Sequence, residues 1–193
     1  LLGDFNLANI LAAVTTGLAL EIKPEIIQKG ISNLQKVPGR FEPVNAGQDF
    51  QVIIDFAHTP DSVARVIKAA KFLCDKNVIV LFGCGGDRDS GKRAEMGRHA
   101  EKLADNVIIT SDNPRTEDPE NIIKDILEGI KDRDQIHVEP DRRKAIHKAL
   151  ETAQPGDMVL LLGKGHESCQ ITGTEKIPFS DANEAEHYLK EKL

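Results

Sequence analysis

The strongest constraint on the fold is an alternation of short apolar runs with helical segments that begins near residue 41. Three of the apolar runs, at 78–82, 107–109 and 158–162, are each followed directly by a polar, turn-forming loop. Strands that alternate with helices in this way predict a mostly parallel sheet with helices on both faces. The sequence from residue 41 onward therefore predicts an α/β fold.

Apolar spacing and the positions of Gly and Pro set the expected elements of this part of the chain. Strands are expected over residues 41–45, 50–55, 77–82, 106–110, 135–139 and 157–162. Helices are expected over residues 61–73, 92–104, 119–131, 142–153 and 182–191. A short hairpin is expected to pair residues 169–171 with residues 176–178.

The first 38 residues have a different character. Alanine and leucine dominate residues 6–20 with apolar side chains at helical spacing, and Pro24 suits the first turn of a second helix over 24–34. The stretch Val37-Pro38-Gly39-Arg40 is turn chemistry that interrupts a continuing helix. We therefore expect two units, residues 1–38 and residues 39–193.

Charge and cysteine usage limit the possible partners. Lys plus Arg minus Asp plus Glu is 25 − 31 = −6, which argues against broad attraction to nucleic acid or to an anionic membrane. The three cysteines are widely spaced and form no zinc-binding motif, which fits a reduced cytosol. No apolar stretch approaches the ~20 residues that span a bilayer. We expect a cytoplasmic protein, and since Leu1 is not methionine we expect it to be a fragment.

The clearest candidate binding loop is the string from Ser111 to Thr116, which follows the apolar run at 107–109. It contains Arg115, whose planar guanidinium matches a ligand carboxylate bidentately. The alternative is a Pro-containing turn in which Asp112 or Asn113 bonds its own backbone. In an open α/β sheet ligands bind beyond the carboxyl ends of the strands, and this loop occupies such an end.

A second candidate loop runs from Gly163 to Glu167 after the run at 158–162. Glu167 has the charge to pair with a ligand ammonium group, and backbone carbonyls would supply further acceptors. The alternative is a plain glycine turn with an exposed His and Glu. Together Arg88, Arg115 and Glu167 supply two positive groups and one negative group at strand ends, which suits a zwitterion with more than one carboxylate.

The loop from Gly86 to Lys92 nearly spells a phosphate-binding P-loop between a strand and a helix. The residue that should be Ser or Thr and hold magnesium is Arg93, which cannot ligate a cation. Backbone N–H groups with Arg88, Lys92 and Arg93 could still bind an anion. A stand-alone nucleotide- or anion-binding module with a degenerate P-loop is therefore the alternative function, and a tight turn with solvated charges is the plainest interpretation.

The string from Asp55 to Asp61 places an Asp and a His at a strand end before a helix. Asp61 could simply cap that helix. His58 is either a ligand contact or an ordinary loop histidine. The sequence contains no convincing catalytic triad and no credible metal cluster, so we expect neither in this chain.

Six separated strings, taken in order, resemble the Mur ligase family of peptidoglycan synthesis, and within it the members that add meso-diaminopimelate. They are Gly3-x-Phe5-Asn6-x-x-Asn9, Val37-Pro38-Gly39-Arg40, and the strings at 55–62, 85–93, 112–115 and 163–167. The resemblance covers essentially the whole chain. It is specific because all six strings agree in order, whereas any one alone would be weak.

The resemblance implies a three-domain ligase. Residues 1–38 resemble the last helices of its central ATP-binding domain, and residues 39–193 resemble its Rossmann-like carboxy-terminal domain. It implies an enzyme in which ATP activates the terminal carboxylate of UDP-MurNAc-L-Ala-D-Glu as an acyl phosphate, which the amino group of diaminopimelate then attacks. ATP and Mg²⁺ would be bound mainly by the upstream domain, and the fragment alone is expected to be inactive and monomeric.

The family's motifs also imply residue roles. The residues implied to hold diaminopimelate are Arg88, Asp112, Asn113, Pro114, Arg115, Gly163 and Glu167. The residues implied to face ATP are Asn6, Asn9, Arg40, Asp55 and His58. Arg115 would grip the carboxylate distant from the reacting centre, and family members that use lysine lack an Arg there. No catalytic residue is implied within this chain.

Overall fold

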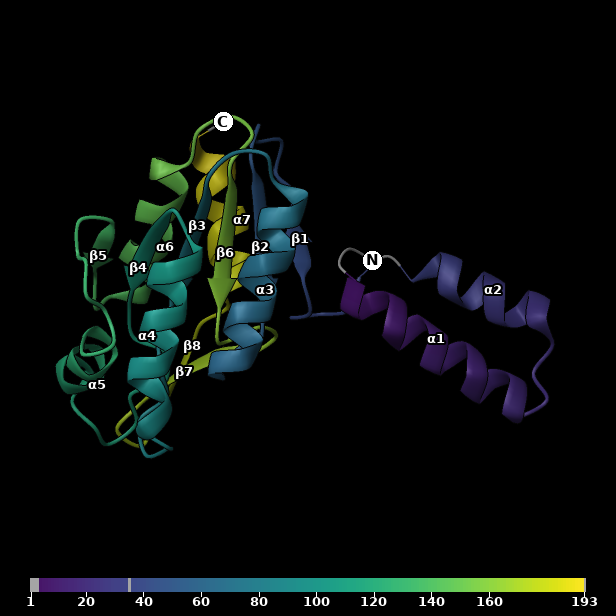
Figure 1. Cartoon of the computed structure of the whole chain (residues 1–193), viewed down its shortest axis with the longest axis horizontal. Helices are drawn as coiled ribbons and strands as arrows, with labels where there is room; N and C mark the ends of the chain where they lie inside the picture. Colours follow the sequence, from purple (N-terminus) through teal and green to yellow (C-terminus); the bar gives the residue numbers. More distant parts are fainter. Residues whose placement is uncertain (1–3, 35, 193) are drawn as a thin grey trace.

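The structure is a computed structural model that describes residues 4–34 and 36–192. Gly3, part of the first family-like string, lies outside the described residues. Two helices, α1 (Asp4–Ala19) and α2 (Pro24–Asn33), form a helical hairpin. Figure 1 shows this helical hairpin projecting away from the sheet, on the side of β1 and α3. The segment that contains the turn at Val37–Arg40 leads from this helical hairpin to the sheet.

The second body is built on a six-stranded sheet of order β1-β2-β6-β3-β4-β5. Its strands are β1 (Glu42–Val44), β2 (Gln51–Asp55), β3 (Val78–Phe82), β4 (Asn106–Ile109), β5 (Ile136–Val138) and β6 (Met158–Leu162). Only the edge strand β1 runs antiparallel, paired with β2, among the described strands of this sheet. The mostly parallel sheet predicted from the alternation of elements is confirmed.

Helices cover both faces of the sheet, as predicted (Figure 1). The helices that cover the sheet are α3 (Pro60–Leu73), α4 (Gly91–Leu103), α5 (Pro119–Leu127), α6 (Arg142–Thr152) and α7 (Asp181–Lys192). One buried apolar cluster joins α3, α4 and α5 to one face, and a second joins α6 and α7 to the other. Successive residues of strand β3 face opposite sides of the sheet, so that Val80 belongs to the first cluster and Leu81 to the second. Each such side chain contributes roughly 1.5–3 kcal/mol by leaving water.

The predicted helix over 119–131 is wrong at its end, because α5 stops at Leu127. Beyond it the N–H groups of Gly129 and Ile130 bond carbonyls three residues back, at Ile126 and Leu127, which tightens the chain into a turn. A Cβ at Gly129 would lie 1.7 Å from the carbonyl oxygen of Ala94 on α4. Close packing of two helices therefore ends α5, which a local pattern does not reveal.

The expected hairpin is present as β7 (Cys169–Thr172) and β8 (Glu175–Pro178), a separate two-stranded sheet. It is attached to the loop after β4 through a parallel bridge between Arg115 and Thr172. The hairpin thus supports a loop that sequence analysis selected as a binding loop.

No helix in the part of the chain that the structure describes has the length and apolarity needed to cross a membrane.

Candidate functional site

The loops that follow β2, β6, β3 and β4 form a pocket at one edge of the sheet. These four strands are consecutive neighbours in the sheet and run parallel, so their carboxyl ends meet. The pocket has a volume of about 360 Å³, and we call it the strand-end pocket. Six residues that the sequence assigned to amino-acid binding line it: Arg88, Asp112, Asn113, Arg115, Gly163 and Glu167.

Pro114 was assigned to the same site but does not line the strand-end pocket. Its carbonyl oxygen instead faces Gly86, where a Cβ would lie only 1.9 Å away. The N–H of Gly86 also donates to the Asn113 carbonyl at 2.9 Å. The two loops after β3 and β4 therefore touch backbone to backbone, and glycine at position 86 is what permits this approach.

The backbone of Arg115 lies in the left-handed region, with φ at 52°. This conformation costs a non-glycine residue about 1–2 kcal/mol. Two hydrogen bonds to the β7–β8 hairpin hold it: the Arg115 N–H donates to the Ile171 carbonyl at 3.0 Å, and the Gly173 N–H donates to the Arg115 carbonyl at 2.7 Å. The guanidinium Nη1 donates to the Gly86 carbonyl at 2.7 Å. Arg115 is thus fixed at both its backbone and its side chain.

Glu167 brings a negative charge to the strand-end pocket, which Arg115 also lines. Its Oε2 accepts hydrogen bonds from Asn113 Nδ2 at 2.8 Å and from Lys164 Nζ at 3.0 Å. Partial burial raises the pKa of Glu167, but these two hydrogen bonds and the charges of Lys164 and Arg115 outweigh it and leave the pKa below its ordinary value. Glu167 is therefore a carboxylate at neutral pH.

Asn113 does not bond its own backbone, so the plain-turn alternative is wrong for this residue. Its Oδ1 accepts from Lys164 Nζ at 3.0 Å and from the Ile171 N–H at 2.9 Å. Together with the bond to Glu167, these contacts tie the loop after β4 to the loop after β6 and to the hairpin. Asn113 is a junction of the strand-end pocket.

Asp112 is almost completely buried against the loop after β6. A Cβ at Gly163, whose φ is 106°, would lie 2.5 Å from Asp112 Oδ2. Burial raises the pKa of Asp112, while the positive charges of Arg142 and Lys164 oppose that rise. Arg88, by contrast, is exposed at the pocket mouth, and its Nη1 donates to the Asp87 carbonyl at 3.1 Å.

Arg93 is not available to an anion, which corrects the suggestion that it could help to bind one. Its side chain is 2% exposed and donates to both carboxylate oxygens of Glu117 at 2.9 Å, and to Asp125 at 2.9 Å. Its Nη2 also reaches the Gly85 carbonyl at 3.2 Å. Arg93 therefore braces the loop after β3 against the chain that follows the Arg115 loop.

Several donors of the loop from Gly86 to Lys92 are already bonded within the protein. The Gly91 N–H donates to Asp89 Oδ1 at 2.9 Å, and the Asp87 N–H donates to the Glu117 carboxylate at 2.5 Å. Lys92 Nζ is bonded to the His58 carbonyl at 2.7 Å. Carboxylates thus occupy two of the backbone N–H groups of this loop, which argues against a degenerate P-loop.

A second pocket, of about 640 Å³, lies between the helical hairpin and the sheet body, and we call it the hinge pocket. Asn6, Asn9, Arg40 and Asp55, four of the five residues assigned to ATP, line it. His58 does not; it lines the strand-end pocket, and its Nδ1 lies 2.7 Å from the Phe56 carbonyl.

Asp55 has a structural task within the hinge pocket. Its two carboxylate oxygens accept the N–H groups of Phe41 and Ala57, each at 2.8 Å. Burial raises its pKa, and those two hydrogen bonds and the charge of Arg40 act against the rise. Asp55 thus shapes the wall of the hinge pocket.

Helix α3, which follows this segment, is capped by Thr59, whose hydroxyl accepts the Ser62 N–H. The suggestion that Asp61 caps this helix is therefore wrong.

The turn at Gly39 joins the two pockets. A Cβ at Gly39, whose φ is 68°, would lie 2.3 Å from the backbone nitrogen of His166. The Gly39 carbonyl accepts the Phe56 N–H at 2.9 Å. The segment that leads to the helical hairpin therefore packs directly on the loop that carries Glu167.

Sequence reasoning missed Lys164 and Arg142. Lys164 is fully buried, and the Arg142 side chain is 0% exposed, at the start of α6. The Arg142 guanidinium donates to the carbonyl of Ser111, the first residue of one binding loop, and to that of Leu162, the residue before the other. Cations in the first turn of a helix oppose the helix dipole, but Arg143 and Lys144 share that position with Arg142, so no signal in the sequence singles out Arg142.

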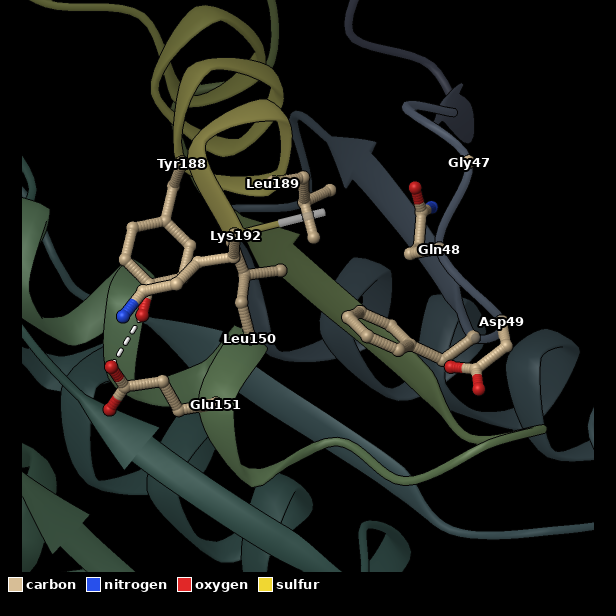
Figure 2. Close-up of a pocket in the computed structure, with 9 residues that line it drawn as sticks. Gly47, Gln48, Asp49, Leu150, Glu151, Tyr188, Leu189 and Lys192 are labelled. Carbon is tan, nitrogen blue, oxygen red and sulfur yellow. Dashed lines mark hydrogen bonds between the residues drawn. The ribbon is translucent and has the colours of Figure 1, made fainter.

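The remaining features do not gather the predicted site residues. A pocket of about 370 Å³ beside α7, drawn in Figure 2, is lined by residues such as Phe50 just before β2, Leu150 of α6, and Tyr188 and Leu189 of α7. Among residues 4–34 and 36–192, no cluster of His, Cys, Asp and Glu could hold a metal ion.

The chain is similar to known proteins over its whole length. A family model described as "Mur ligase, glutamate ligase domain" matches residues 39–165. A curated relative from Thermosynechococcus vestitus, named UDP-N-acetylmuramoyl-L-alanyl-D-glutamate--2,6-diaminopimelate ligase, is 49% identical over 195 residues. The alignment covers 100% of this chain and 39% of that relative. The chain thus spans about two fifths of the length of such relatives.

Solved structures give the same picture. A structure titled as a UDP-N-acetylmuramoyl-L-alanyl-D-glutamate--2,6-diaminopimelate ligase superposes with a TM-score of 0.79 at 38% identity, covering 100% of this chain and 39% of that one. E. coli FolC in complex with ADP superposes with a TM-score of 0.63 at 25% identity, covering 86% of this chain and 38% of that one. These comparisons give no support to a stand-alone nucleotide-binding module.

Proposed function

The chain belongs to the Mur ligase family, and from that premise we propose that it is the amino-acid-binding part of an ATP-dependent ligase. The proposed reaction adds meso-diaminopimelate to UDP-MurNAc-L-Ala-D-Glu. The observation that carries the choice of amino acid is that Arg115 and Glu167 line one pocket. A fixed cation beside a fixed anion matches an amino-acid head group, and diaminopimelate has one such group at each end.

Within the strand-end pocket the roles follow from charge and position. Arg115 is proposed to bind the carboxylate distant from the reacting amino group, since its guanidinium keeps donors beyond the one given to Gly86. Glu167 is proposed to bind the neighbouring ammonium. Arg88 at the mouth is suited to the carboxylate at the reacting end, and the glycines at 85 and 163 let the ligand approach the backbone.

We propose that residues 1–38 belong to the central ATP-binding domain and that residues 39–193 form the carboxy-terminal domain. Support comes from the helical hairpin, where Leu7, Leu11 and Leu18 are each at least half exposed. Apolar side chains in such number on one short element are typical of a surface that packs against more protein.

The hinge pocket fits the nucleoside end of ATP. Asn6 and Asn9 bring amide groups that both donate and accept, as the edge of adenine requires, and Arg40 adds a positive charge at the wall. ATP, when bound, supplies the phosphoryl group that activates the substrate carboxylate. Mg²⁺ and the phosphates are proposed to be held mainly by the upstream domain. Carboxylates occupy the N–H groups of Asp87 and Gly91, and Arg93 stands where a P-loop has the Ser or Thr that holds magnesium.

The contribution of this chain to the reaction is then positional. The strand-end pocket orients the incoming amino group, and the contact between Gly39 and His166 transmits the position of the ATP-binding part to the loop that carries Glu167. Holding two reactants in register is a large source of rate acceleration. Cytoplasmic action agrees with the three free cysteines.

The test is a product assay on the full-length ligase that contains this chain, with UDP-MurNAc-L-Ala-D-Glu, ATP and Mg²⁺. We expect product with meso-diaminopimelate and on the order of 10⁴-fold less efficient use of L-lysine, because lysine leaves Arg115 without its carboxylate. Equal use of lysine would contradict the assignment. The 193-residue chain alone should form no product, since the reaction needs several domains around the substrates.

A further inference from the structure

Lys164 is a fully buried cation between two glycines of the loop after β6. The exposed fraction of its side chain is 0%. The backbone of Gly163 and that of Gly165 both have positive φ, at 106° and 53°. This loop turns the lysine side chain inward, where its ammonium donates to Asn113 Oδ1 and Glu167 Oε2, both at 3.0 Å.

Burial of an ammonium group carries a desolvation penalty of several kcal/mol per ion, which a single neighbour seldom offsets. An apolar side chain of the same length would fill this space at lower cost. Lys164 is therefore a poor choice for stability alone, and what it does for Glu167 is the informative question.

Both protein donors to Glu167 reach the same oxygen, Oε2. Among the residues that the structure describes, no donor is bonded to Oε1. The Glu167 side chain is 33% exposed and lines the strand-end pocket. One oxygen is thus anchored inside the protein and the other is left for a ligand.

Arg115 lines the same pocket with the opposite charge, yet Arg115 and Glu167 form no ion pair within 4.0 Å in the described structure. Arg115 Nη1 is drawn to the Gly86 carbonyl, and Glu167 is drawn to Lys164 and Asn113. Without such restraints, two opposite charges in one pocket would attract each other and close the space that the ligand needs.

We propose that Lys164 is a positioning residue that holds Glu167 apart from Arg115, so that Glu167 Oε1 receives the ammonium of the bound amino acid. The proposal rests on the proposed function and deepens it. Lys164 would hold Glu167 in its binding position before the ligand arrives. Binding of the amino acid then does not have to include the free-energy cost of ordering Glu167. The lowered pKa of Glu167 agrees with this, because a protonated Glu167 would not attract an ammonium.

The test compares Lys164→Met with a matched control, Lys124→Met, in the full-length ligase. Lys124 is an exposed lysine of α5. Lys164→Met keeps the length of the side chain and removes its charge. We expect the diaminopimelate KM to rise about tenfold or more, since mispositioning one partner of a desolvated charge contact costs over 1.4 kcal/mol. The KM for ATP should stay unchanged, and Lys124→Met should resemble the wild type.

A double-mutant cycle shows whether Lys164 acts through Glu167. In a Glu167→Gln background the further change Lys164→Met should alter the diaminopimelate KM less than about twofold, because the group that Lys164 positions is already gone. Thermal unfolding of each variant checks that it folds. If Lys164→Met does not fold, Lys164→Gln replaces it in the cycle, because glutamine keeps an N–H donor for Asn113 Oδ1 and Glu167 Oε2.

Three outcomes would overturn the proposal. These are an unchanged diaminopimelate KM in Lys164→Met, an equal rise in both KM values, and an undiminished effect in the Glu167→Gln background. Failure of the proposed function itself is distinguishable, because it would appear in the wild-type ligase as no use of diaminopimelate.

Discussion

Arg142 and Asp181 form an ion pair with no exposed surface, in which Nε and Nη2 of the arginine donate to the two carboxylate oxygens at 2.8 and 2.6 Å. Arg142 begins α6 and Asp181 begins α7. The same guanidinium donates to the Leu162 carbonyl at 2.9 Å and to the Ser111 carbonyl at 3.3 Å. One buried arginine therefore connects the last helix to the end of β6 and to the loop after β4, two of the four segments that surround the strand-end pocket.

Replacing Asp181 by Asn should destabilise the sheet body by about 3–5 kcal/mol, because it leaves the buried Arg142 charge uncompensated. Urea unfolding monitored by circular dichroism measures the change. The exposed pair of Asp61 and Arg65 supplies the control. Asp61→Asn should change stability by less than about 0.5 kcal/mol. A loss below about 1 kcal/mol for Asp181→Asn would show that the pair is not the anchor described here.

Removing the Arg115 guanidinium should weaken diaminopimelate binding specifically. In the full-length ligase Arg115→Ala should raise the diaminopimelate KM by about 10²- to 10³-fold, which corresponds to losing one partner of a desolvated charge pair. The KM for ATP should remain nearly the same. Arg98→Ala, on the exposed face of α4, is the control and should behave as wild type. Parallel increases in both KM values would contradict the assigned role.

Adding one methyl group at Gly86 should disturb the contact between the two loops. The new Cβ would lie 1.9 Å from the Pro114 carbonyl oxygen, so Gly86→Ala should cost about 1–3 kcal/mol through overpacking and also raise the diaminopimelate KM. Gly30→Ala is the matched control, because its Cβ meets no atom within 4 Å and alanine favours the helix by up to about 1 kcal/mol. If Gly86→Ala and Gly30→Ala shifted the midpoint of unfolding by the same amount and in the same direction, the result would be inconsistent with this packing.

Tyr188 should titrate far above its ordinary range. Burial and the hydrogen bond to Glu151, visible as the dashed line in Figure 2, raise its pKa to about 12. The folded state holds this proton more tightly than the unfolded state, in which tyrosine has a pKa of about 10. The stability that it contributes is therefore complete below about pH 10 and is lost as the pH rises towards 12.

Tyrosinate absorbance measures this directly, because the sequence has one tyrosine and no tryptophan. The midpoint in the folded chain should lie near 12, with circular dichroism confirming the fold at each pH. Glu151→Gln should lower the midpoint but leave it above about 10, since burial remains. A wild-type midpoint near 10 would show that the phenol is solvated.

The individual strands and helices were largely predictable because they depend on local pattern. Burial on both faces makes β3 and β6 continuous apolar runs, and such runs are visible in the sequence. The end of α5 was not predictable, since it depends on the contact of Gly129 with Ala94, residues 35 positions apart along the chain.

The site was predictable to the extent that its residues occur in loops at strand ends. That rule, with the family resemblance, indicated Arg115 and Glu167, and both line the strand-end pocket. It could not show that Lys164 is buried or that Arg93 is braced by Glu117, because both facts depend on which distant side chains lie nearby.

The sequence by itself determined the order of elements, the mostly parallel sheet and the loops that carry charged side chains, because apolar periodicity and turn residues act over a few positions. Only the tertiary structure decided which charged side chains line the pocket and which are paired with other charged groups inside the protein. Arg115 and Arg93 are both arginines after a strand, yet one lines the pocket and the other is enclosed by carboxylates. The physical reason is that a charge depends on the partners and the water around it, and folding sets both.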